Sequence, residues 1–95
     1  LKTYNSDGTK TSYLGTSLNG GGLLSVENGG VIGTYNSDGK QTTSLGTGGS
    51  GGGNLKTYNK YEKMIGYLGT SKEQDGMILL TDTYGGPGWS KRAKQ

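Results

Sequence analysis

The chain has 95 residues, of which 21 are glycine, 27% are hydrophobic and none is cysteine or histidine, and its formal net charge is +3 at pH 7. This composition leaves little material for a globular core, which is already hard to build in a short chain. It excludes disulfides and removes the usual ligands and nucleophiles of zinc, haem, thiol and imidazole chemistry. The low hydrophobic content is compatible with a flexible Gly/Ser-rich linker, which is one interpretation. Disordered chains usually also have a high net charge, however, and this chain does not.

Internal repeats dominate the sequence. TYNSDGTKTSYLGT begins at Thr3, TYNSDGKQTTSLGT at Thr34 and TYNKYEKMIGYLGT at Thr57. An apolar residue stands at the start of each repeat, and the steps between these residues are 23, 8, 23 and 23 for Leu1, Leu24, Ile32, Leu55 and Ile78. We predict a 23-residue repeat that divides into segments of 8, 8 and 7 residues, with one inserted octad, LSVENGGV.

Each segment is expected to form a short strand followed by a corner. In LKTYN (residues 1–5), Leu and Thr alternate with Lys and Tyr, which is the period of a strand. The NSDG sequence that follows is typical of a turn, because Asn5 can bond its own backbone and Gly8 can adopt a positive φ. The second strand ends at Leu14, before Gly-Thr. No segment shows apolar residues at helical spacing.

Three short sides per repeat indicate a triangular coil. One extra side would turn a single-chain solenoid by a third of a revolution and break its stacking. Three identical chains around a threefold axis tolerate the same insertion, because every layer still holds the same segment from each chain. We therefore predict an all-β repetitive solenoid, specifically a parallel intertwined homotrimeric β-helix in the form of a triangular prism. A single-chain solenoid is the alternative.

This pattern resembles the intertwined trimeric β-helix or β-prism repeats of phage tail needles, spikes and fibres, and of bacterial surface fibres. The resemblance covers residue 1 to about residue 85 and rests on the register of apolar residue, Thr and Asn and on the LGT corner. It implies a rigid extracellular or virion-borne rod. The sequence departs from the family's best-known octad, which has Gly where Thr, Val or Leu stands here.

The register predicts which side chains face the axis of the trimer. The expected structural core consists of Leu1, Thr3, Leu14, Leu24, Val26, Ile32, Thr34, Leu45, Leu55, Thr57, Leu68, Ile78 and Leu80. Asn5, Asn36 and Asn59 would also line the axis, either as rings of hydrogen bonds or around an ion. Residues 1–85 would form the shaft, and residues 86–95 a C-terminal cap or tail.

Four aromatic residues are candidates for partner binding: Tyr4, Tyr35, Tyr58 and Trp89. The tyrosines form a regular row that is expected to face outward, where it could bind sugars or shield the strand face. Trp89 could close the end of the prism or contact a surface. A threonine row resembles those of ice-binding proteins, but here it should face the axis.

Three weaker motifs have simpler explanations. Residues 46–51 fit GxGxxG, but a strand rather than a helix is expected after them. A calcium loop that began at residue 3 would need Asp at its first place and Glu at its twelfth, where the sequence has Thr3 and Leu14. Glu73 and Asp75 are the only loop acids worth testing for catalysis, and a solvated loop explains them better. We expect no catalytic, cofactor-binding or metal-binding residues.

The predicted function is therefore structural, as a rigid trimeric shaft of a phage tail or bacterial extracellular appendage without enzymatic activity. The alternative is a module that binds a surface glycan or protein through its tyrosine rows or C-terminal end. The expected partners are copies of the chain itself, with other fibre proteins or a cell-surface glycan as further candidates, and no nucleic acid. The longest apolar runs are too short to enter a membrane.

Overall fold

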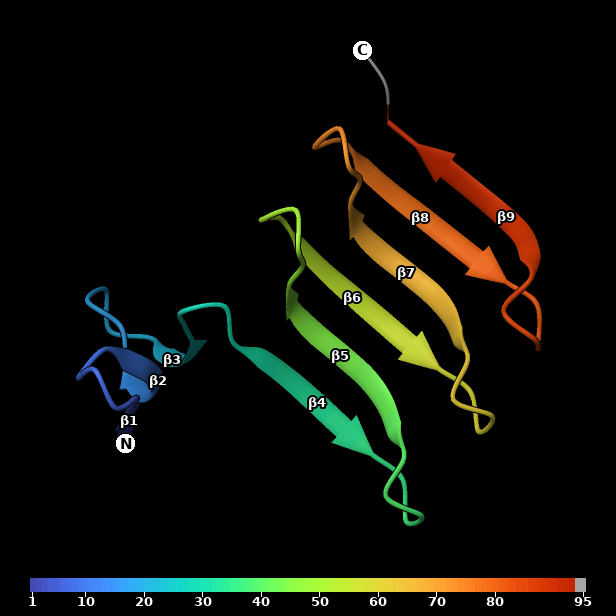
Figure 1. Ribbon diagram of the computed structural model, residues 1–95. Helices are drawn as coiled ribbons and strands as arrows, with labels where there is room; N and C mark the ends of the chain where they lie inside the picture. Colours follow the sequence, from blue (N-terminus) through green and yellow to red (C-terminus); the bar gives the residue numbers. More distant parts are fainter. Residues whose placement is uncertain (94–95) are drawn as a thin grey trace. The chain divides into compact units, whose positions relative to one another are not determined.

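The computed structural model describes residues 1–93, and in that range every regular element is a β-strand (Figure 1). β1, β2 and β3 form one antiparallel sheet, and β4 to β9 form a second antiparallel sheet in chain order. The strands are β1 (Lys2–Tyr4), β2 (Lys10–Thr16), β3 (Gly22–Val26), β4 (Val31–Tyr35), β5 (Gln41–Thr47), β6 (Gly53–Tyr58), β7 (Met64–Thr70), β8 (Gly76–Thr81) and β9 (Pro87–Arg92).

The 23-residue repeat consists of two antiparallel strands and two turns. Its first strand carries the apolar residue that starts each repeat, for example Leu55 in β6 and Ile78 in β8. Its second strand carries the Leu-Gly-Thr sequence, for example Leu68 in β7. Every second strand of the meander is therefore equivalent, and the repeat advances along the sheet by two strands.

The predicted Asn-x-x-Gly turns are confirmed. The side-chain oxygen of Asn36 accepts hydrogen bonds from the backbone N–H groups of Asp38 and Lys40, both at 3.0 Å. The backbone N–H of Asn36 also donates to the carbonyl of Lys40 at 2.9 Å. Gly39 has a φ of 82°, which costs glycine nothing in steric terms. Asn5, Asn59 and Asp82 form the same side-chain bonds in their own turns.

The chain reverses completely at these turns, and this overturns the predicted parallel β-helix. A prism corner would redirect the chain by a third of a revolution, so that the next strand would lie on another face. Here each turn is closed by backbone bonds between its two ends, so the next strand lies beside the previous one and antiparallel to it. The period-two pattern is the same in both arrangements, so it could not distinguish them. The description of the chain as a β-helix repeat is thus wrong.

The eight-residue step marks the break between the two sheets. Contacts divide the chain into two units, residues 1–30 and 31–95. β3 begins a repeat, but after Asn28 (φ 60°) and Gly29 (φ 77°) the chain starts a new repeat at β4 instead of returning along β3. The inserted octad is therefore a repeat whose second strand is missing, and not an added side of a prism.

Neither sheet buries a hydrophobic core. Among residues 1–93, no hydrophobic side chain is classed as buried, and the buried residues are Asn54 and Ser71. Each sheet is held by its backbone hydrogen bonds, its turns and its cross-strand side-chain pairs. A single sheet of this kind leaves both of its faces available to other molecules.

Candidate assembly surface and lysine–tyrosine cleft

One face of the β4–β9 sheet carries an unbroken row of large apolar side chains. Residues that are directly opposite on neighbouring antiparallel strands share a face. The register places five apolar residues opposite one another in sequence, one per strand from β4 to β8: Ile32, Leu45, Leu55, Leu68 and Ile78. Lys91 of β9 ends the row.

The β1–β3 sheet carries a shorter row of the same kind. Leu14 faces Leu24 across β2 and β3. Leu1 and Leu14 exchange backbone hydrogen bonds of 2.8 and 3.0 Å, so they also form a directly opposed pair. We call these two sets the apolar rows. They consist of Leu1, Leu14 and Leu24 in the first sheet and of Ile32, Leu45, Leu55, Leu68 and Ile78 in the second.

The remaining predicted core residues lie beside the apolar rows. Thr3 and Val26 both face Ser12 in the first sheet. In the second sheet the neighbouring row consists of Thr34, Thr43, Thr57, Gly66, Leu80 and Trp89. All thirteen predicted core residues therefore lie on one face of their own sheet, the face that bears its apolar row.

This face is open to solvent. Leu45 is 49% exposed and Leu68 is 54% exposed, and the other residues of the two rows are between 39% and 84% exposed. Gly66 has no side chain, so a shallow groove of about 220 Å³ forms there between Leu55, Leu68 and Leu80. The residues predicted to form a core thus form a surface of the single chain.

Small residues flank the long apolar row on both sides. On one side the neighbouring row has small residues on β4 to β7, namely Thr34, Thr43, Thr57 and Gly66. The same row has the larger Leu80 and Trp89 on β8 and β9. On the other side Thr47 faces Gly53, and Thr70 faces Gly76. Over β4 to β7 the large apolar stripe is therefore only one residue wide.

The four aromatic candidates for partner binding do not share one surface. Tyr35 of β4 and Tyr58 of β6 each come directly after a threonine of the apolar face. Tyr35 lies opposite Gln41, and Tyr58 lies opposite Met64. By alternation they belong to the opposite face, as does Tyr4 in the first sheet. Trp89, in contrast, lies directly opposite Leu80 on the apolar face, where it is 54% exposed. Of the predicted cap, residues 94–95 lie outside the described residues.

The other residues singled out in the sequence have structural roles. The side-chain oxygens of Asn5, Asn36 and Asn59 bond to their own turns and so line no axis, which corrects that expectation. Glu73 pairs with Arg92, and the backbone N–H of Asp75 donates to Ser71 Oγ at 3.2 Å. The GxGxxG segment, residues 46–51, includes the end of β5 and the turn that leads into the strand β6, whereas the nucleotide motif requires a helix.

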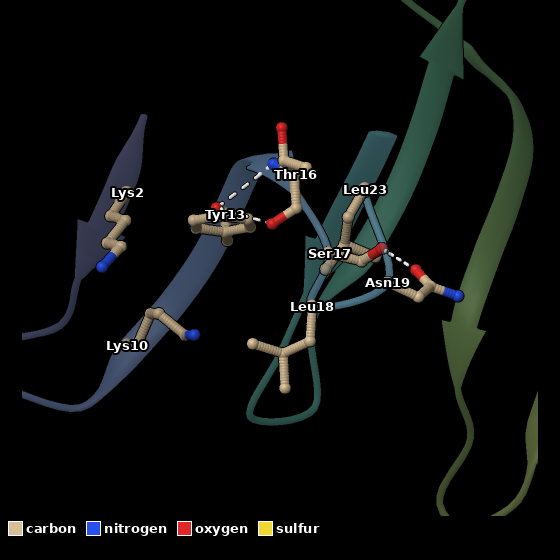
Figure 2. Close-up of a pocket in the computed structure, with 8 residues that line it drawn as sticks. All are labelled: Lys2, Lys10, Tyr13, Thr16, Ser17, Leu18, Asn19 and Leu23. Carbon is tan, nitrogen blue, oxygen red and sulfur yellow. Dashed lines mark hydrogen bonds between the residues drawn. The ribbon is translucent and has the colours of Figure 1, made fainter. Parts of the chain in front are cut away.

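A cleft of about 600 Å³ opens on the first sheet and was not predicted from the sequence (Figure 2). The ammonium groups of Lys2 and Lys10 lie 5.6 and 5.4 Å from the centre of the Tyr13 ring. Leu18 and Leu23 line the cleft together with three polar residues, Thr16 at the end of β2 and Ser17 and Asn19 in the turn after it. The only signal in the sequence was the pairing of Lys2 with Tyr13, which requires the register to be known.

The Tyr-Leu-Gly-Thr sequence fixes the tyrosine ring of this cleft. The hydroxyl of Tyr13 donates to the carbonyl of Thr16 at 3.1 Å and accepts from the N–H of Thr16 at 3.3 Å. The ring thereby lies over Gly15, and a Cβ built there would be 2.5 Å from the hydroxyl oxygen. In the second sheet Tyr67 forms the corresponding bond to the carbonyl of Thr70 at 2.7 Å.

Within residues 1–93 the structure shows no helix that could span a membrane and no cluster of acidic side chains that could hold a metal ion. Comparisons with protein-family models, curated proteins and solved structures gave no match.

Proposed function

We propose that the chain is a non-catalytic structural segment of a fibre, in which identical copies associate through the apolar rows. The observation that supports this is the unbroken Ile32–Leu45–Leu55–Leu68–Ile78 row, which is exposed on a sheet without a buried core. Contiguous apolar surface of this kind marks an interaction site. A second copy is the simplest partner, because it supplies the same row at the same spacing.

The gain from association is large relative to the stability of a small chain. Moving a half-exposed Leu or Ile into a dry interface contributes on the order of 1 kcal/mol. The five residues of the long row would then contribute on the order of 5 kcal/mol per copy. That is comparable to the whole free energy of unfolding of many small domains. Association would therefore supply the core that the single chain lacks.

The width of the stripe favours three copies over two. In a two-layer sandwich the sheets stay about 10 Å apart across their width, so the flanking rows would also need large side chains. Three sheets around one axis converge away from that axis, and small flanking residues are then needed. The Thr and Gly rows beside the apolar row meet this requirement over β4 to β7. Each chain in this trimer keeps its own antiparallel sheets.

The apolar row crosses the strands, so an assembly built on it would grow in the direction of the row as repeats are added. Five strand spacings of about 4.8 Å give the second sheet a length of about 24 Å in this direction. We also propose that this fibre lies outside the cell or on a virion, as part of a phage tail or a bacterial appendage. The support for that location is the repeat pattern, which resembles those of such fibres.

A second candidate function is surface binding by the same fibre segment. Trp89 at the end of the apolar face and the cleft at Tyr13 favour it, because both present exposed aromatic or cationic groups to a partner. The partner would be another fibre protein or a surface glycan.

The native mass in solution tests the structural proposal. We expect light scattering after gel filtration to give three times 9.9 kDa. The urea midpoint should also rise with protein concentration, because only the folded state associates. A folded monomer with a midpoint that is independent of concentration would overturn the proposal.

A further inference from the structure

The cleft on the first sheet combines cations, an aromatic ring and an apolar wall. Lys2 and Lys10 stand beside Tyr13, and Leu18 and Leu23 line the cleft with them (Figure 2). Lys2 is directly opposite Tyr13, and Leu23 is directly opposite Gly15. Leu18 lies in the turn after β2 and is completely exposed. The cleft thus belongs to one sheet and needs no second unit to form it.

The cleft lies on the face opposite the apolar row. Tyr13 and Leu14 are consecutive residues of β2, so their side chains lie on opposite faces. An assembly that buries Leu14 would therefore leave Tyr13 and its two lysines accessible. Binding at the cleft is consequently independent of association through the apolar rows, and it rests on and deepens the second candidate function, surface binding.

The ring of Tyr13 is held before any ligand arrives. Its hydroxyl both donates to and accepts from the backbone of Thr16, at 3.1 and 3.3 Å. A wall that is fixed in advance costs little conformational entropy on binding. Both ammonium groups are drawn to this wall, which keeps two positive charges at one place.

One carboxylate balances part of this charge. Glu27 Oε2 lies 3.4 Å from Lys10 Nζ and also accepts a hydrogen bond from Ser25 Oγ at 2.9 Å. The residues that line the cleft include no acid. Lys2 and Lys10 therefore leave the cleft with an excess of positive charge, and a ligand carboxylate could take the place of Glu27 beside Lys10.

The repeat provides an internal comparison. In the copy that contains Tyr67, Lys56 lies opposite the tyrosine as Lys2 does opposite Tyr13, but Met64 stands where the first copy has Lys10. In the copy that begins at Thr34, the three corresponding positions hold Gly33, Gln41 and Ser44. Two lysines on one tyrosine are therefore not required by the repeat architecture.

We propose that this cleft binds a carboxylate-bearing sugar, as in an acidic polysaccharide. The two ammonium groups suit a carboxylate, since hydrogen bonds between charged groups are the strong ones. Leu18 and Leu23 suit the C–H face of a sugar ring, and Thr16, Ser17 and Asn19 provide hydroxyl and amide groups for its hydroxyls. A purely apolar or purely anionic ligand would use only half of these groups.

The test is isothermal titration of the full chain with a tetramer of galacturonic acid at low ionic strength, and with the neutral galactose tetramer. We expect binding of the acidic tetramer only, at one site per chain. Lys10→Met should weaken it at least tenfold. Lys2→Met should also weaken binding, and its matched control is Lys56→Met, which removes the lysine opposite the equivalent Tyr67 and should leave the affinity unchanged. Glu27→Gln should tighten binding severalfold, because it removes the competing carboxylate.

Four results would overturn the proposal. These are no binding of the acidic tetramer, equal binding of the neutral tetramer, equal losses for Lys10→Met and Lys56→Met, and equal displacement by acetate or inorganic phosphate at the concentration of the sugar. The last result would indicate a general anion site. Gel filtration of each variant separates these results from a change in assembly, since Lys10 lies away from the apolar row.

Discussion

Ser44 and Leu45 are neighbours in β5, yet their side chains lie on opposite faces of the sheet, one polar and one apolar. Leu45 lies between Ile32 and Leu55 in the apolar row, whereas Ser44 lies opposite Lys56. The same substitution at the two positions therefore separates the role of the apolar face from that of the strand.

We predict that Leu45→Asp abolishes self-association. A carboxylate in the middle of the row would have to be buried without a partner, which costs several kcal/mol. Ser44→Asp should leave the native mass unchanged, because the new carboxylate would face Lys56 on the other side. Sedimentation velocity of both variants measures this. Association that survives Leu45→Asp would show that copies meet on some other surface.

We predict that Asn36→Ala lowers the free energy of unfolding by about 1 kcal/mol, the typical net contribution of such hydrogen bonds. The substitution removes the acceptor of the N–H groups of Asp38 and Lys40. Ser37→Ala in the same turn is the control and should change the free energy by only a few tenths of a kcal/mol. Urea titrations at one fixed protein concentration give both values. Equal effects would mean that the Asn side chain adds nothing specific to the turn.

We predict that Glu62→Gly stabilises the chain. Glu62 has a φ of 65°, at the turn position where Gly8, Gly39 and Gly85 stand in other repeats. The left-handed conformation costs an L-residue about 1 kcal/mol or more, and glycine avoids that cost but loses part of it in conformational entropy. We expect a net gain of about 0.5 kcal/mol. The ion pair with Lys40, at 4.0 Å on the surface, contributes little to set against it.

The matched control for Glu62→Gly is the reverse change, Gly39→Glu, which should lower the free energy of unfolding by about 1 kcal/mol. The urea midpoints of the two variants should shift in opposite directions. Two shifts of the same sign would argue that this turn position does not prefer glycine.

We predict that Gly69→Ala destabilises the second sheet by about 2 kcal/mol, within the range for overpacked positions. A Cβ at Gly69 would lie 2.6 Å from the Cβ of Asn54 and 2.7 Å from the carbonyl oxygen of Gly53, so a strand would have to move. Gly49→Ala is the control, because a Cβ there meets nothing within 4 Å. Thermal unfolding followed by circular dichroism distinguishes the variants. A Gly69→Ala chain as stable as the Gly49→Ala chain would refute the crowding.

Much of the local structure was predictable from the sequence, and the connections between strands were not. The alternation in LKTYN predicted strands, and the Asn-x-x-Gly segments predicted the turns with the positive φ at Gly8 and Gly39. Neither signal states how far the chain rotates at a turn. That rotation depends on the backbone bonds that close the turn, such as the one from Asn36 to Lys40, and it distinguishes a hairpin from a corner.

The candidate surface was only partly predictable for the same reason. Period two assigned Leu45 and Leu68 to one face of their strands, and that assignment holds for either topology. Whether the face is buried depends on what covers it, which no pattern within one chain encodes. The cleft at Tyr13 was missed because Lys2 and Lys10 flank it from two strands, and their approach depends on the register between β1 and β2.

The repeat of two strands and two turns has a consequence for the length of the molecule. Each additional 23-residue unit would extend a sheet by about 10 Å and return the chain to the same side, with the next apolar residue already in line. A gene encoding such a chain could therefore lengthen or shorten a sheet by whole units while the length of its strands stayed constant. The half unit between Gly22 and Gly30 shows the other possibility, because an odd number of strands ends one sheet and begins the next.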